Sequence, residues 1–138
     1  MKYLDKVDDT IIYFLTLAQE AQKRAYAPYS RFRVGAVAVG KSNKAYTGCN
    51  IENASYPLSM CAERVALFKA ISEGESEIKA LYIIGPENGP ISPCGACRQV
   101  IFELAKDAII YLSNHDLTKI VETNIKELLP YGFGLQKR

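Results

Sequence analysis

Residues 61–64 read Cys61-Ala62-Glu63-Arg64, and the run Pro93-Cys94-Gly95-Ala96-Cys97-Arg98 follows later in the chain. Three of the four cysteines fall in these two blocks, and each block begins a segment with the apolar spacing of an amphipathic helix. Side chains in the first turn of a helix tilt toward its N-terminus, so Cys61 and Glu63 can both point toward one site beyond the helix end. The two cysteines of the second block are three residues apart and share one helix face. The sequence therefore predicts a fold in which strands hold two helix N-termini and three thiols side by side.

The segments around these blocks alternate between helical and strand patterns. Helices are predicted near residues 7–25, 60–72, 94–105 and 125–129, and strands at 34–39, 45–49, 78–84, 108–112 and 120–121. Turn residues at 40–43 make the first two strands a hairpin, and helices between the later strands predict parallel pairing. The expected fold class is α/β, a three-layer α/β/α arrangement with a mixed sheet of about five strands. Residues 1–138 are expected to form a single domain.

The composition excludes several classes of protein. The chain has 138 residues, 49% hydrophobic and 23% charged, which is normal for a globular domain. Its 17 basic and 15 acidic residues leave a net charge of +2, so electrostatics favours neither a nucleic-acid partner nor a membrane. The N-terminus lacks the apolar core of a signal peptide, and no run approaches the roughly 20 apolar residues of a membrane span. We therefore expect a cytoplasmic protein.

In a reducing compartment, the cysteine spacing indicates metal or redox chemistry rather than disulfides. Helix N-termini stabilise thiolates, and three thiolates match Zn²⁺ in softness while leaving a fourth coordination position open. His115 is the only histidine and lies in a turn-like stretch, so it is expected to be a solvated loop residue. Cys49 ends a strand without a partner at metal-ligand spacing and is expected to be a small buried residue.

The residues beside the first cysteine favour a catalytic over a structural zinc site. A structural site needs no carboxylate near an open coordination position, whereas a hydrolytic site needs a base to move protons, and Glu63 fits that role. Three thiolates and Zn²⁺ leave a net negative charge, which the neighbouring Arg64 would offset. Ala62, near the same helix start, offers a backbone N–H to a substrate carbonyl.

A Cys-x-Glu block followed by Pro-Cys-x-x-Cys is the three-cysteine form of the zinc deaminase pattern. The chain resembles the cytidine deaminases of the small, homotetrameric class, and the resemblance runs over nearly its whole length. It is carried by Tyr26–Phe32, Gly48–Ala54, Cys61–Arg64, Ser92–Gln99 and Leu128–Pro130.

The resemblance implies zinc-dependent hydrolysis of cytidine and 2′-deoxycytidine to the uridines and ammonia, a step of pyrimidine salvage. It implies one Zn²⁺ per chain, with Cys61, Cys94 and Cys97 as ligands. It also implies that Asn50 and Glu52 hydrogen-bond the ribose hydroxyls, that Phe32 packs against the nucleoside, and that Phe133 enters the site of a neighbouring subunit in a homotetramer.

Three alternatives stay open at the level of sequence. A thiol-disulfide oxidoreductase would use Cys94 and Cys97 but would leave Cys61 and Glu63 without a role. A non-catalytic zinc module lacks a fourth ligand. A deaminase of another aminated substrate, such as blasticidin S or an RNA base, is the third, although Asn50 and Glu52 favour a nucleoside. The sequence assigns no role to Arg98 or to residues 57–60, and gives no preference between the two nucleosides.

Overall fold

The computed structural model describes residues 1–137. The strands are β1 Lys2–Tyr3, β2 Gly35–Gly40, β3 Ala45–Cys49, β4 Ile78–Ile84, β5 Ile109–Ser113 and β6 Ile120–Thr123. The helices are α1 Asp9–Gln22, α2 Ala62–Ser72, α3 Gly95–Leu104 and α4 Ile125–Leu128, with a short 3-10 helix, η1, at Tyr56–Leu58. The helices and longer strands predicted from the sequence are all present, with ends that differ by a few residues.

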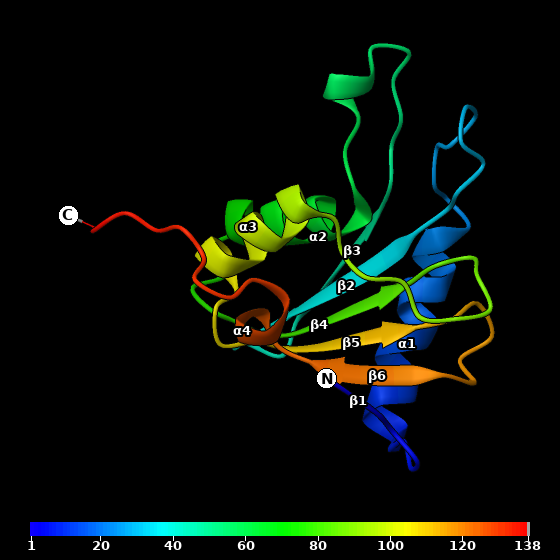
Figure 1. The fold of residues 1–138 in the computed structure, drawn as a ribbon, viewed down its shortest axis with the longest axis horizontal. Coiled ribbons are helices and arrows are strands. Elements are labelled where there is room, and N and C mark those ends of the chain that lie inside the picture. The colour runs from blue at the N-terminus through cyan, green and yellow to red at the C-terminus, as the bar shows by residue number, and fades with distance from the viewer. Residues whose placement is uncertain (138) are drawn as a thin grey trace.

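The strands form one mixed sheet in the order β1-β6-β5-β4-β2-β3 (Figure 1). The sheet has six strands rather than the five expected, because β1 pairs antiparallel with β6 through Lys2 and Tyr3. A strand of two residues is too short to show an alternating apolar pattern, and its pairing partner lies near the other end of the chain. The expected α/β class and mixed sheet are confirmed.

The direction of the strands explains where the helices begin. β4 and β5 pair in parallel, as predicted for strands joined by a helix. The same prediction is wrong for β3 and β4, because β2 lies between them and pairs antiparallel with both. β3 and β4 nevertheless run in the same direction, so α2 and α3, which follow them, both start at the same edge of the sheet.

Helices cover both faces of the sheet (Figure 1). On one face α1 packs Ile11, Leu15 and Ala18 against alternate residues of the central strands; these residues are Val37, Val39, Ala80, Tyr82 and Ile84. Ala36, Ala38, Leu81 and Ile83 point the other way, against α2 and α3. A Cβ at Gly35 would lie 1.9 Å from the Ala18 carbonyl oxygen, so only glycine lets α1 approach β2 so closely.

A cysteine occupies the N-cap position of both helices, and the side chain of Cys94, unlike that of Cys61, accepts a capping hydrogen bond. Cys61 and Cys94 are the N-cap residues of α2 and α3, with extended backbone conformations. The helix predicted from residue 60 begins later, at Ala62, because Met60 exchanges two backbone hydrogen bonds of 2.9 Å with Ile51. This bridge ties the chain entering α2 to the end of β3.

The longest helix, α1, has 14 residues. Within residues 1–137 no helix combines the length and the apolar character needed to cross a bilayer.

Candidate metal centre and active-site pocket

The three cysteines of the two blocks converge at the helix N-termini. The sulfur atoms of Cys61, Cys94 and Cys97 all lie within 4.8 Å of one another, and the Cys61 and Cys94 sulfurs are 3.8 Å apart. Sulfurs bound to one tetrahedral zinc at about 2.3 Å are separated by about 3.8 Å. The residues present therefore fit a zinc ion, and the donor set is soft, as zinc prefers.

The pKa values of two of the three thiols, Cys61 and Cys97, are shifted in opposite directions. The hydrogen bond from Cys97 and the neighbouring Arg64 lower the pKa of Cys61 to about 5, against the opposing effect of burial. Conversely, the bond to Cys61, followed by burial and the Glu63 carboxylate, raises the pKa of Cys97. These two directions favour a thiolate at Cys61 and a thiol at Cys97, whose proton a soft divalent cation would displace on binding.

Arg64 lies beside this cluster. Its Nη2 atom donates a hydrogen bond of 3.4 Å to the Cys61 sulfur, which raises the pKa of the guanidinium. The Arg64 Nε atom is buried and has no hydrogen-bond partner within residues 1–137. The guanidinium therefore presents its positive charge to the Cys61 sulfur.

Glu63 is a buried charged side chain in the site. It lies in the first turn of α2 and is only 4% exposed. Burial raises the pKa of its carboxyl, because the ionised form is poorly solvated, while a hydrogen bond with Cys97 opposes that rise. A carboxyl in this environment can both accept and release a proton.

The cluster opens into a pocket of about 320 Å³. It is lined by Ser30, Phe32, Val34, Asn50, Glu52, Cys61, Ala62, Glu63, Ile91, Ser92, Pro93 and Cys94. Seven of the residues predicted from the sequence thus share one cavity wall, and Cys97 joins them through its sulfur. Ser30, Val34, Ile91, Ser92 and Pro93 were not predicted, although each lies within a few residues of one that was.

Asn50 and Glu52 follow the end of β3 and line the same pocket as Cys61 and Cys94. Asn50 Oδ1 accepts a hydrogen bond of 2.8 Å from the Val34 N–H, and its Nδ2 donates one of 2.7 Å to the Phe32 carbonyl. Hydrogen bonds from Ser30 lower the pKa of Glu52, so this carboxylate is ionised. Asn50 and Glu52 are thus both hydrogen-bonded to the segment 29–34, which contains Phe32.

Phe133 is the predicted substrate-binding residue that the structure leaves outside this pocket. It is 66% exposed on the C-terminal tail, which runs away from the body of the domain (Figure 1), and its carbonyl accepts a hydrogen bond of 2.9 Å from Gln99 Nε2. Cys49 lies at the end of β3, apart from the cluster. His115 is on an exposed loop, as the sequence predicts.

Arg98, which the sequence left without a role, is half-buried in α3. Its guanidinium donates to the Pro93 carbonyl at 2.8 Å, to the Leu128 carbonyl at 2.6 Å and to the Ser92 hydroxyl at 2.7 Å. It therefore fastens the turn before Cys94 to the end of α4.

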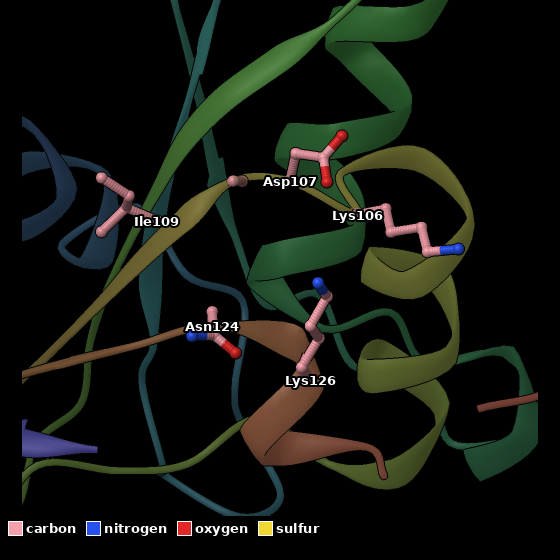
Figure 2. A pocket seen from close by; sticks show the side chains of 6 residues that line it. Lys106, Asp107, Ile109, Asn124 and Lys126 are labelled. Atoms are coloured by element: carbon pink, nitrogen blue, oxygen red, sulfur yellow. The ribbon is translucent and has the colours of Figure 1, made fainter. Parts of the chain in front are cut away.

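A second hollow, of about 250 Å³, lies at the opposite edge of the sheet, between the start of β5 and α4. Figure 2 shows that Lys106, Asp107 and Lys126 around it point in different directions. These three charged groups therefore do not converge on one point of the hollow.

Comparisons with known proteins agree with this geometry. A family model for the cytidine and deoxycytidylate deaminase zinc-binding region matches residues 8–113. The cytidine deaminase of Halalkalibacterium halodurans is 49% identical over 117 residues, covering 84% of this chain and 88% of the relative. That of Sporosarcina psychrophila is 46% identical over 118 residues, covering 85% and 86%. The crystal structure of cytidine deaminase from Burkholderia pseudomallei superposes with a TM-score of 0.85 at 43% identity, covering 88% of this chain and 98% of that one.

Proposed function

Because this chain belongs to the cytidine and deoxycytidylate deaminase family, we propose that it hydrolyses cytidine and 2′-deoxycytidine to the uridines and ammonia. The observation that carries the proposal is a buried carboxylate, Glu63, in the same pocket as three converging cysteine sulfurs. A purely structural zinc site has no use for such a carboxylate, whereas hydrolysis requires a group that moves protons.

Cys61, Cys94 and Cys97 would hold the zinc ion. When bound, zinc supplies a water acidic enough to act as a nucleophile near neutral pH. Arg64, which donates to the Cys61 sulfur, offsets part of the negative charge of the three thiolates. The two helix N-termini, capped by Cys61 and Cys94, act in the same sense.

Glu63 carries the protons. It accepts one from the attacking water as the oxygen bonds to C4 of the pyrimidine, and it delivers that proton to ring N3. It then moves the remaining hydroxyl proton to the exocyclic nitrogen, the C4–N bond breaks, and ammonia leaves. The water thereby supplies one oxygen and both protons, and no oxidant or reductant is needed.

The remaining pocket residues orient the nucleoside. The N–H of Ala62, the first residue of α2, has no intrahelical acceptor and donates to the base carbonyl. Phe32 packs against the nucleoside. Asn50 keeps one amide hydrogen and one lone pair after its two hydrogen bonds, and with Glu52 it binds the ribose hydroxyls.

The active form is proposed to be a homotetramer with sites shared between subunits. Support comes from Phe133, which is exposed and lies outside the pocket of its own chain. Other large apolar side chains, including Tyr56 and Leu58 of η1, are about 70% exposed. An aromatic ring on a tail that a partner subunit holds can stack on a pyrimidine.

Ammonia release from cytidine, 2′-deoxycytidine, cytosine, dCMP and a cytidine-containing oligonucleotide tests the substrate class. The two nucleosides should be turned over faster than cytosine, because cytosine has no sugar hydroxyls for Asn50 and Glu52 to bind. Turnover of the oligonucleotide alone would favour an RNA-base deaminase instead. One tightly held zinc per chain after purification under reducing conditions would argue against the thiol redox alternative.

The Glu63→Ala variant tests the proton carrier directly. Its turnover should fall by about 10²–10⁴-fold or more, because the only buried carboxylate of the pocket is lost. Its zinc content should stay near one per chain, since Glu63 is not a ligand. Retained turnover would remove Glu63 from the mechanism.

A further inference from the structure

Ser30 connects two of the residues proposed to bind the nucleoside. Its hydroxyl donates a short hydrogen bond to Glu52 Oε2 and accepts one of 3.0 Å from the Phe32 N–H. Its own N–H donates to Glu52 Oε1 at 3.2 Å. A serine hydroxyl has one proton to donate, and in Ser30 that proton is committed to Glu52.

The carboxylate of Glu52 is largely immobilised by these bonds. It accepts from the Ser30 hydroxyl, from the Ser30 N–H and, at 3.0 Å, from the Tyr29 N–H. An ionised carboxylate offers about four acceptor positions, so about one is left for a substrate hydroxyl. The same bonds lower the pKa of Glu52, with the Ser30 hydroxyl as the largest cause, so the acceptor stays ionised.

The backbone turn that delivers Phe32 to the pocket depends on the same hydroxyl. Arg31, between Ser30 and Phe32, has a φ of 58°. This value lies in the left-handed region, which residues other than glycine rarely adopt. This conformation is held by the bond from Phe32 N–H to the Ser30 hydroxyl and by the bond of 3.0 Å from Arg31 N–H to the Ala27 carbonyl. Beyond the turn, Asn50 holds the Phe32 carbonyl.

We propose that Ser30 is a positioning residue for sugar recognition, whose hydroxyl fixes the Glu52 carboxylate and the Phe32 backbone in their binding positions. The proposal rests on the proposed function, since it takes Glu52 as a ribose ligand. Ser30 itself acts through Glu52 rather than on the reacting atoms.

A double-mutant cycle with Ser30→Ala and Glu52→Gln tests this coupling through steady-state kinetics with cytidine. Ser30→Ala alone should raise KM about tenfold and leave kcat within about twofold, because a hydrogen bond to a charged group is lost at a binding contact. In the Glu52→Gln background the same change should raise KM no more than about twofold. Ser30→Thr, which keeps the hydroxyl, should restore most of the wild-type KM.

Ser42→Ala provides a matched control. The Ser42 hydroxyl also donates to a glutamate carboxylate, Glu75, and accepts from the N–H two residues later, that of Lys44, at 3.3 Å, but it lies away from the pocket. This variant should leave KM unchanged.

Equal effects of Ser30→Ala in both backgrounds, or no effect in either, would overturn the proposal. A Glu52→Gln enzyme with unchanged KM would remove its premise and the proposal with it, while leaving cytidine deamination intact. Failure of the wild-type enzyme to deaminate cytidine would instead refute the proposed function.

Discussion

At the scale of single residues, Cys94 combines two local roles. Its sulfur accepts a hydrogen bond of 3.5 Å from the Cys97 N–H and so caps α3, and the same sulfur belongs to the three-thiol cluster. Serine is also a good N-cap residue but a poor zinc ligand. Replacing Cys94 by serine therefore separates the two roles.

We expect Cys94→Ser to keep α3 but to weaken zinc binding by more than about 100-fold, since one of three ligands is lost. Zinc content after dialysis against a chelator, measured by mass spectrometry, should fall from about one per chain to near none. Far-UV circular dichroism should stay unchanged in excess zinc.

Cys49→Ser is the control, because Cys49 lies outside the cluster. It should retain its zinc. Full zinc retention by Cys94→Ser would contradict the ligand assignment.

At the scale of secondary-structure elements, the α1 face of the sheet contains a cluster of three aromatic rings. The ring centroid of Tyr82 in β4 lies 5.0 Å from that of Tyr111 in β5, with the ring planes 13° apart. It lies 5.1 Å from the ring centroid of Phe14 in α1. Such pairs add to the stabilisation that comes from burial. Burial, with smaller effects from Tyr111 and Asp8, raises the pKa of Tyr82 to about 12.

This shift predicts how stability depends on alkaline pH. The folded state holds the Tyr82 proton more tightly than the unfolded chain, whose tyrosines titrate near pH 10. The stabilisation is therefore complete below about pH 10 and is lost as the pH rises toward about 12. Tyr82→Phe removes the ionisable group, so its unfolding midpoint in a pH titration followed by circular dichroism should lie at higher pH than that of the wild type.

The fully exposed Tyr131 serves as the comparison. Tyr131→Phe should unfold at the wild-type pH. An identical midpoint for Tyr82→Phe would show that another group triggers the alkaline transition.

At the scale of the whole molecule, the pocket of one chain contains the proposed catalytic groups but no residue from the C-terminal tail. The tail is anchored to its own chain by Gln99, and it exposes Phe133 and Leu135. If Phe133 completes the site of a neighbour, two inactive variants should complement each other within one tetramer.

Subunits with Phe133→Ala, co-expressed in equal amounts with subunits carrying Glu63→Gln, should recover about a quarter of wild-type turnover in hybrid tetramers. A site with an intact Glu63 then receives an intact Phe133 from its neighbour. Activity of purified hybrids, compared with that of each parent, measures the effect.

The control pairs Phe133→Ala subunits with subunits that carry both substitutions, and no recovery is expected there. Hybrids whose activity is only the mean of the two parents would place Phe133 outside the neighbouring site.

The sequence alone determined the helices and buried strands of this protein and the family to which it belongs. Apolar periodicity acts over a few residues, so the helices and the buried strands could be predicted within a few positions. The proposed ligands could be picked out for the same reason, because Cys94 and Cys97 are related by one helix turn and Cys61 opens the other helix.

Only the tertiary structure decided the arrangements that depend on partners far apart in the chain. β2 lies between β3 and β4, and β1 adds a sixth strand by pairing with β6. Ser30 meets Glu52 across 22 residues of sequence. A strand's neighbours and a side chain's hydrogen-bond partners are set by the packing of the whole sheet, which no local pattern encodes. The start of α2 and α3 at one sheet edge, and hence the convergence of the three sulfurs, follows from that packing.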